Sequence, residues 1–278
     1  MKRKILVLML ALVMVLTMGM LVGCGDDKNG DADADANAEK DTLVVGLDDA
    51  FAPMGFRDED GELVGFDIDL ARAVGEELGM TVEFSPIDWE AKETALMTGA
   101  VDCLWNGMSV LPERIEQMAL TYQYLNNKIV LMVLADSDLD VTSAEQLADM
   151  KIGTQAGSSA LKMLQENEAY ESYKDNISEY DAYDTAIMDL KAGRVDVIAV
   201  DQVLGEYTNN NLGGEMKECT YSLGNDYYTI GCASDNTELR DKLNEALKAL
   251  IDNGTAAEIS EKWFGRDIMI YEPIEGEE

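Results

Sequence analysis

Short β-rich runs alternate with helical patterns along most of the chain. The segment 66–78 carries apolar residues at helical spacing on one side, and the apolar runs 43–47 and 80–84 around it are typical of strands. Further strands are predicted at 101–105, 128–134, 151–154, 195–200 and 227–233, and further helices at 91–97, 143–149, 158–165, 185–190, 239–251 and 256–264. This alternation predicts an α/β fold.

One pattern occurs twice. A predicted helix ends at a glycine and a strand follows at once, first at 99–102 (Gly-Ala-Val-Asp) and again at 193–196 (Gly-Arg-Val-Asp). Each glycine is expected to end its helix as a left-handed cap, and the β-branched run behind it suits a buried parallel strand. The repeat predicts two similar α/β lobes rather than one long sheet.

The first 23 residues have the pattern of an export signal. Basic residues 2–4 precede an apolar run at 5–20, and Leu-Val-Gly stands directly before Cys24, as in the bacterial lipobox. We expect removal of 1–23 and lipidation of Cys24; a transmembrane helix is the alternative, because the apolar run reaches the lower limit of a span. Residues 25–41 contain almost nothing to bury and predict a disordered acidic tether.

The chain is strongly acidic, with 21 Lys and Arg against 55 Asp and Glu and a formal net charge of −34. Nucleic acid and anionic lipid surfaces are therefore poor partners. Such a charge tolerates cationic or zwitterionic small ligands, although a solvated acidic surface is the favoured explanation. Charge alone does not define a substrate.

Histidine is absent, which excludes Ser-His-Asp and Cys-His nucleophiles and most zinc chemistry. Three cysteines remain besides Cys24, namely Cys103, Cys219 and Cys232, without C-x-x-C spacing. We expect buried thiols, no metal site and no cofactor.

Ligands of open α/β sheets sit beyond the carboxyl ends of the strands, so residues after each strand are the candidates for function. Four such loops stand out for their polar or aromatic groups. They contain Asp48, Asp49 and Phe51; Asn106, Gly107, Met108 and Ser109; Gln155, Ser158 and Ser159; and Asp201.

Arg114 and Asp201 together suit an α-amino acid. The planar fork of Arg114 fits a carboxylate, Asp201 fits an ammonium group, and Ser109, Ser158 and Ser159 supply hydroxyl or backbone donors. Each residue also has a simpler interpretation, as a surface arginine and as a helix N-cap respectively.

The chain after the tether resembles the polar-amino-acid solute-binding proteins of ABC importers. The resemblance is carried by 43–73, 87–114, 151–161 and 193–201, and most strongly by Gly-Phe-Asp-Ile-Asp-Leu at 65–70. It implies a bilobed type II periplasmic-binding fold with two hinge crossings, and it supports the roles of Arg114 and Asp201. It also implies ligand contacts for Asp48, Phe51, Trp89, Asn106, Gly107, Ser109, Ser158 and Ser159.

The chain departs from the family near the side-chain pocket, at 54–55 (Met-Gly), at 106–107 (Asn-Gly) and at Leu111. Phe51 and Trp89 are expected to flank the aliphatic stem of the ligand or to stack on a guanidinium, with ordinary core positions as the alternative. Asp48 or Asp49 suits a basic side chain and Asn106 a polar one. The pattern favours a polar or basic ligand.

The resemblance implies ligand binding by hinge closure and delivery to a membrane permease. The crossings are expected near 124–128 and 221–226, so that lobe 1 comprises 42–126 and 225–278 and lobe 2 comprises 127–224. A lipid-anchored, extracytoplasmic monomer that is not an enzyme is expected.

Two other functions are weighed. The first is a secreted dehydratase of the cyclohexadienyl type on the same fold, for which Asp48, Asp49 or Glu90 would be the general acid. The second is a ligand-sensing domain, which is disfavoured because only an acidic tail follows Phe264.

Overall fold

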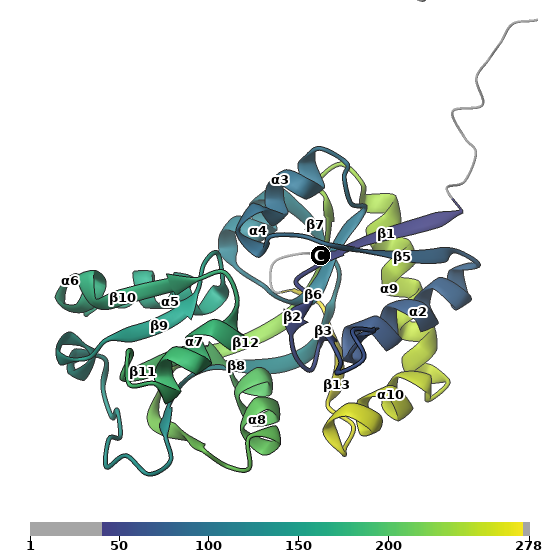
Figure 1. Ribbon diagram of the computed structural model, residues 1–278. Helices are drawn as coiled ribbons and strands as arrows, with labels where there is room; N and C mark the ends of the chain where they lie inside the picture. Colours follow the sequence, from purple (N-terminus) through teal and green to yellow (C-terminus); the bar gives the residue numbers. More distant parts are fainter. Residues whose placement is uncertain (1–40, 275–278) are drawn as a thin grey trace, which may run out of the picture. The chain divides into compact units, whose positions relative to one another are not determined.

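The computed structural model describes residues 41–274 (Figure 1). Its main feature is a ten-stranded sheet. The strands follow the order β10 (Ile177–Tyr180), β9 (Ile152–Gln155), β11 (Val197–Asp201), β8 (Gln123–Leu134), β12 (Met216–Ala233), β6 (Cys103–Ser109), β1 (Thr42–Leu47) and β5 (Thr81–Pro86), while β13 (Met269–Glu272) pairs with β8 and β7 (Met118–Leu120) with β12.

The sheet has two parallel ends and an antiparallel centre. Strands β5, β1 and β6 are parallel at one end, here called the β1 side, and β10, β9 and β11 are parallel at the other, the β9 side. The long strands β8 and β12 pair antiparallel between them. We expected two lobes rather than one long sheet. The part of this expectation that excluded a continuous sheet was wrong, because β8 and β12 continue the hydrogen bonding through the predicted crossings.

Helices accompany both ends of the sheet (Figure 1). The β1 side carries α2 (Phe66–Leu78), α3 (Lys92–Met97), α4 (Pro112–Gln117), α9 (Thr237–Asp252), α10 (Thr255–Phe264) and the 3₁₀ turn η1 (Trp89–Ala91). The β9 side carries α5 (Ser159–Glu166), α6 (Tyr170–Tyr173), α7 (Tyr183–Lys191), α8 (Gln202–Asn211) and the 3₁₀ turns η2 (Ala144–Asp149) and η3 (Lys174–Asn176). A small sheet of β2 (Ala50–Phe51), β3 (Gly55–Arg57) and β4 (Leu63–Val64) follows β1.

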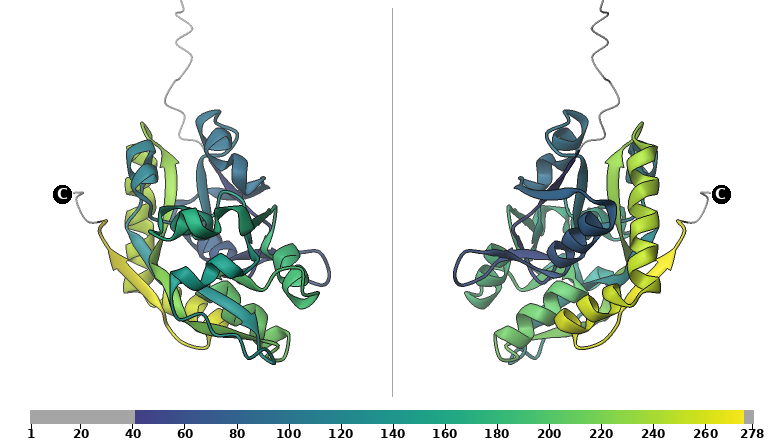
Figure 2. Two further views of the ribbon diagram at one scale, coloured as in Figure 1. Left: turned by 90° about the vertical axis from the view of Figure 1, so that its left-hand side faces the viewer. Right: turned by 90° about the vertical axis from the view of Figure 1, so that its right-hand side faces the viewer.

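The end of the described chain returns to the β1 side. Helices α9 and α10 pack against α2, and Figure 2 (right) shows them along one side of the molecule. Asp69 on α2 accepts from Lys262 Nζ at 2.6 Å and from Trp263 Nε1 at 2.8 Å on α10. The lobe boundaries at 126–127 and 224–225 stay a prediction, but this packing joins segments that they assign to one lobe.

Helix α2 begins and ends where the apolar spacing predicts. Its inner face buries Phe66, Ile68, Leu70 and Val74, and Gly79 ends it with a left-handed φ of 69°. A glycine costs least there because it has no Cβ to strain. Local sequence therefore fixes this helix.

The repeated glycine-strand pattern builds the same structure twice. Gly99 and Gly193 cap α3 and α7 with φ of 71° and 69°. Asp102 Oδ2 then accepts from the Val44 N–H at 2.7 Å, and Asp196 Oδ2 accepts from the Lys151 N–H at 2.8 Å. Each aspartate thus ties a new strand to the first strand of its own side.

Other expectations need correction. Residues 106–109, expected as a loop, continue strand β6, because they pair with β12. The predicted helix at 143–149 is the 3₁₀ turn η2. Strands β2, β3, β4, β7, β10 and β13 and helices α4 and α6 were not predicted, since each is too short to show a period.

The three cysteines of the described chain are buried, as expected, and Cys103 lies opposite Cys232 on paired strands. Across residues 41–274, none of the helices has the length and apolar character to cross a membrane. The predicted signal, Cys24 and the tether up to residue 40 lie outside the described residues.

Candidate functional site

The carboxyl ends of the parallel strands of both sides meet at one small pocket. Its lining is Asp48, Phe51, Trp89, Asn106, Gly107, Ser109, Arg114, Gln155, Ser158, Ser159 and Asp201. The structure brings together all the predicted site residues of the described chain except Met108.

Met108 is the exception because its side chain packs into the core. It is fully buried in the cluster with Leu104 and Met118. Its role as a lining residue is withdrawn. Gln155 joins the lining from the end of β9, in a loop that the sequence singled out.

Arg114 is the buried cation of the pocket. It lies on α4 with 4% of its surface exposed, and its Nη1 donates to the Ser109 carbonyl at 2.9 Å. No carboxylate of residues 41–274 lies within ion-pair distance of its guanidinium. Burial lowers the pKa of Arg114 from its usual value, yet arginine stays charged. Most of its five N–H donors remain for an anion.

Asp201 lines the same pocket from the β9 side. Its Oδ1 accepts from Asn127 Nδ2 and from the Tyr228 hydroxyl, each at 2.7 Å, and Oδ2 has no donor in the described chain. It occupies the N-cap position of α8 but makes no side-chain capping bond. The N-cap interpretation therefore does not account for its side chain.

A second buried carboxylate, Asp226, shares a hydrogen-bond donor with Asp201, and sequence reasoning missed it. Asp226 Oδ2 accepts from Ser109 Oγ at 2.9 Å and from the same Asn127 Nδ2 at 2.8 Å, while its Oδ1 has no partner. Burial raises the pKa of Asp201 to about 7 and that of Asp226 to about 6, and the two carboxylates repel each other's charge. A cation near Asp201 would relieve this repulsion.

Asp48, which follows β1, contacts the β9 side. Its Oδ2 accepts from Gln155 Nε2 at 2.6 Å and its Oδ1 from the Ala50 N–H at 2.9 Å. Burial raises its pKa, and the bond from Gln155 opposes that rise. Asp49, the alternative, pairs with Arg57 at 2.7 Å, with its side chain 34% exposed, and does not line the pocket.

The β6 segment is held from behind by a buried acid. The Gly107 N–H donates to Asp67 Oδ2 at 2.7 Å, and the Tyr124 hydroxyl donates to both oxygens of Asp67. Gly107 has a φ of 56°, and a Cβ there would come within 2.8 Å of the Phe51 ring. Burial raises the pKa of Asp67 to about 7. Gly107 thus offers the ligand space rather than its N–H.

Several pocket groups are committed to the protein and one is not. The hydroxyl of Ser158 donates to the Gln155 carbonyl at 2.8 Å and caps α5 by accepting from the Leu161 N–H. Asn106 Oδ1 accepts from the Asp48 N–H at 3.2 Å, but its Nδ2 is buried without a partner. Such an orphan donor calls for an acceptor from outside the chain.

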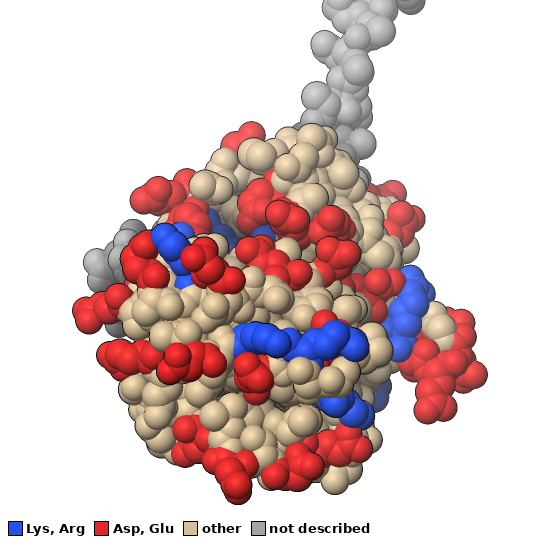
Figure 3. Space-filling model, turned by 60° about the vertical axis from the view of Figure 1, so that its left-hand side comes forward, with Lys and Arg blue, Asp and Glu red and all other residues tan. Residues whose placement is uncertain are grey.

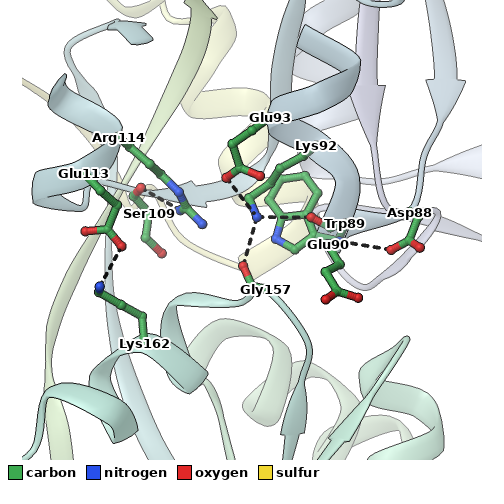
Figure 4. Close-up of polar contacts among 10 residues, drawn as sticks. All are labelled: Asp88, Trp89, Glu90, Lys92, Glu93, Ser109, Glu113, Arg114, Gly157 and Lys162. Carbon is green, nitrogen blue, oxygen red and sulfur yellow. Dashed lines mark hydrogen bonds and ion pairs between the residues drawn. The ribbon is translucent and has the colours of Figure 1, made fainter. Parts of the chain in front are cut away.

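Lys92 is a buried cation that sequence reasoning overlooked (Figure 4). Only 2% of it is exposed, and its Nζ donates to the carbonyls of Trp89 at 3.1 Å and Gly157 at 2.9 Å. Glu93 Oε1 lies 3.2 Å from the same nitrogen. Burial, with Arg114 nearby, lowers its pKa to about 8. A helix-period pattern alone gives no signal for this burial.

A wider hollow lies between α8 and the α10–β13 segment, lined in part by Tyr207 and Trp263. Its charged residues Lys128, Glu206 and Arg266 are all exposed. Buried and partly unpaired charges converge only on the smaller pocket among those two, and we therefore take the smaller one as the site. Figure 3 shows that acidic side chains spread over the face turned to the viewer, with few basic groups among them.

Residues 43–266 match the model of the bacterial extracellular solute-binding proteins, family 3. The chain therefore belongs to this family. It has the type II fold of periplasmic binding proteins, and this agrees with the expected class.

The relatives are amino-acid-binding proteins. The L-cystine-binding protein TcyJ of Escherichia coli (strain K12) is 27% identical over 236 residues, covering 83% of this chain and 85% of that protein. ABC transporter arginine-binding protein 1 of the same organism is 31% identical over 226 residues, covering 79% and 89%. A histidine-bound substrate-binding protein of an ABC uptake transporter from Streptococcus pneumoniae superposes with a TM-score of 0.77 at 36% identity, covering 82% and 94%. The chain is thus an amino-acid-binding protein of the ABC transporter type.

Proposed function

We propose that this protein binds a polar or basic L-amino acid between two lobes and delivers it, by hinge closure, to the permease of an ABC importer. Arg114 takes the α-carboxylate and Asp201 takes the α-ammonium group. The observation that carries the proposal is the state of Arg114, which is buried without a carboxylate partner in the described chain although its charge persists.

The positions of the two charges support a bridging ligand. Arg114 follows β6 on the β1 side, and Asp201 ends β11 on the β9 side. A zwitterion between them pairs with both, and it removes the cost of leaving each charge buried alone. The ligand can favour the closed arrangement, with the two sides together, only to the extent that it binds this arrangement more tightly than the open one.

The polar lining supports the side-chain preference. Asp48 offers a carboxylate and Asn106 Nδ2 an unused donor, while Phe51 and Trp89 supply apolar and aromatic surface. These groups suit a side chain that combines an aliphatic or flat stem with a polar end. The relatives named for cystine, arginine and histidine fall in the same range.

The proposal includes export and anchoring through Cys24 after removal of residues 1–23, with 25–41 as the tether. The support is the sequence pattern of the first 24 residues. Cells fed a labelled fatty acid are expected to label the wild-type protein and not the Cys24→Ser protein. A wild-type protein without label would contradict the lipid anchor.

A ligand panel tests the binding proposal directly. Residues 42–278 are titrated by calorimetry with arginine, lysine, ornithine, histidine, glutamine, cystine, aspartate and leucine. We expect saturable binding of at least one polar or basic member, and a dissociation constant near micromolar corresponds to about −8 kcal/mol. Binding of leucine alone would overturn the side-chain preference, and no binding to any member would overturn the function.

The D-enantiomer of the best ligand is the matched control. Two fixed charges and a third, side-chain contact discriminate the hand of an α-carbon, so D-amino acid binding is expected to be far weaker. Turnover of prephenate or arogenate by the same preparation would favour the dehydratase instead.

A further inference from the structure

Lys92 makes a contact between the two sides of the sheet without touching the pocket. It begins α3 on the β1 side, and the Gly157 carbonyl that it reaches belongs to the turn between β9 and α5 on the β9 side (Figure 4). The two residues are 65 positions apart in the chain. Lys92 does not line the pocket.

All three donors of the ammonium group have acceptors. Two are the carbonyls of Trp89 and Gly157, and the third is the carboxylate of Glu93. The ammonium also lies 5.2 Å from the centre of the Trp89 ring. No donor remains for a ligand, so Lys92 is not a second carboxylate-binding cation.

Gly157 fits this contact because it has no side chain. Its φ is +66°, and a Cβ there would lie 3.0 Å from Glu90 Cα and 3.5 Å from the Trp89 carbonyl. The turn therefore rests on η1 with backbone against backbone. Directly behind it come Ser158 and Ser159, which line the pocket.

We propose that Lys92 is a positioning residue. It holds the Gly157 turn of the β9 side against η1 of the β1 side, and it thereby strengthens the binding of every ligand by the same factor. The proposal rests on the proposed function, because the contact exists only while the two sides are together. Separation of the sides would break the Lys92 to Gly157 bond and would expose both groups to water.

An ion pair between the sides gives a contrast. Lys162 on α5 lies 3.2 Å from Glu113 on α4 (Figure 4), and their side chains are 33% and 37% exposed. Lys162 also pairs with Glu166. Exposed pairs of this kind contribute little. Lys92 differs because its removal leaves two carbonyls without their donor in a buried place, whereas water replaces the donor when the sides separate.

The test measures dissociation constants for the best ligand and two weaker ones with the wild type, Lys92→Met and Lys162→Met. Lys92→Met is expected to weaken all three by one common factor, roughly tenfold. Lys162→Met is expected to change them less than about twofold. A dissociation constant unchanged by Lys92→Met, or a changed order of preference, would overturn the proposal.

Gly157→Ala provides an independent variant, and thermal unfolding followed by circular dichroism verifies that each variant folds. The added methyl pushes the turn off η1, so Gly157→Ala should again weaken all ligands by a common factor. The double variant should lose less than the product of the two single losses, because both act on one contact. Fully multiplicative losses would contradict the shared contact. If the wild type binds no amino acid, the proposed function fails as well. If the wild type binds and the variants bind just as tightly, only this inference fails.

Discussion

The helix-glycine-strand unit is built alike on the two sides of the sheet, but it ends in opposite charges. Asp102 and Asp196 tie their strands to a neighbouring strand with bonds of 2.7 and 2.8 Å, so the two frames are equivalent. Past the carboxyl end of β6 comes the cation Arg114, whereas β11 ends in the anion Asp201. The repeat therefore sets the backbone frame, and the few residues after each strand set the chemistry.

Removal of the cation should have the largest effect on binding. Arg114→Ala is expected to weaken amino-acid binding by about 2–5 kcal/mol, because the ligand carboxylate would be buried unpaired. Calorimetry with the preferred ligand measures the loss, and Arg57→Ala, which removes an exposed arginine outside the pocket, serves as the control. An Arg114→Ala protein with wild-type affinity would remove the clamp from the proposal.

Removal of the anion should cost less and should also change the pH dependence. Burial and Asp226 raise the pKa of Asp201 to about 7, so acidification protonates the group that the ligand ammonium needs. Wild-type affinity should therefore fall as the pH drops from about 7 to 5, by at most about tenfold per pH unit. Asp201→Asn should bind weakly with a flatter profile. Parallel profiles for the two proteins would argue against a role of Asp201 as counter-ion.

The buried acid behind β6, Asp67, is expected to affect the stability of the protein rather than ligand binding. The pKa of Asp67 is raised to about 7, against about 3.9 in an unfolded chain, so the native state holds a proton that the unfolded chain loses. The free energy of unfolding should fall as the pH rises from 4 to 7, by up to about 1.4 kcal/mol per unit, and this penalty is full above 7.

Asp67→Asn should remove that penalty, since its amide oxygen still accepts from Gly107 and Tyr124 can accept from the amide. Denaturant unfolding at pH 5 and pH 8 should show a gain in stability that grows with pH. Glu76→Gln, an exposed change on the same helix, is the control. A gain that is equal at both pH values would rule out titration of Asp67 as the cause.

The smallest effect concerns the two frames themselves. Asp102→Ala and Asp196→Ala each remove a carboxylate that accepts a backbone N–H, and each should cost about 1 kcal/mol of unfolding free energy. Melting curves of the two variants should shift by similar amounts. A large shift for one alone would show that the frames are not equivalent.

Local sequence predicted those parts of the molecule that local interactions determine. Helix α2 has its predicted limits, and the glycine caps at Gly99 and Gly193 lie where the repeat indicates. The strand-end rule gathered the pocket residues, because it depends only on which strand each residue follows.

The parts that were missed depend on distant neighbours. Lys92 had the pattern of a surface residue on a helix, and its burial comes from Gly157. Asp226 and Asn127 fell within predicted crossings, and they became buried partners of Asp201 only because β8 and β12 pair there. The mistaken loop at 106–109 has the same origin, since pairing with β12 extends β6.

The antiparallel ribbon of β8 and β12 limits how the molecule can deform. Sliding one strand along the other would break the cross-strand bonds from Gly224 to Tyr228 together, whereas bending keeps them. The register of β12 is irregular between Glu218 and Gly224, and such bulges bend a strand easily. In the hinge closure proposed above, the ribbon would favour flexing about one axis over sliding, so that the same two faces would meet in the same alignment each time.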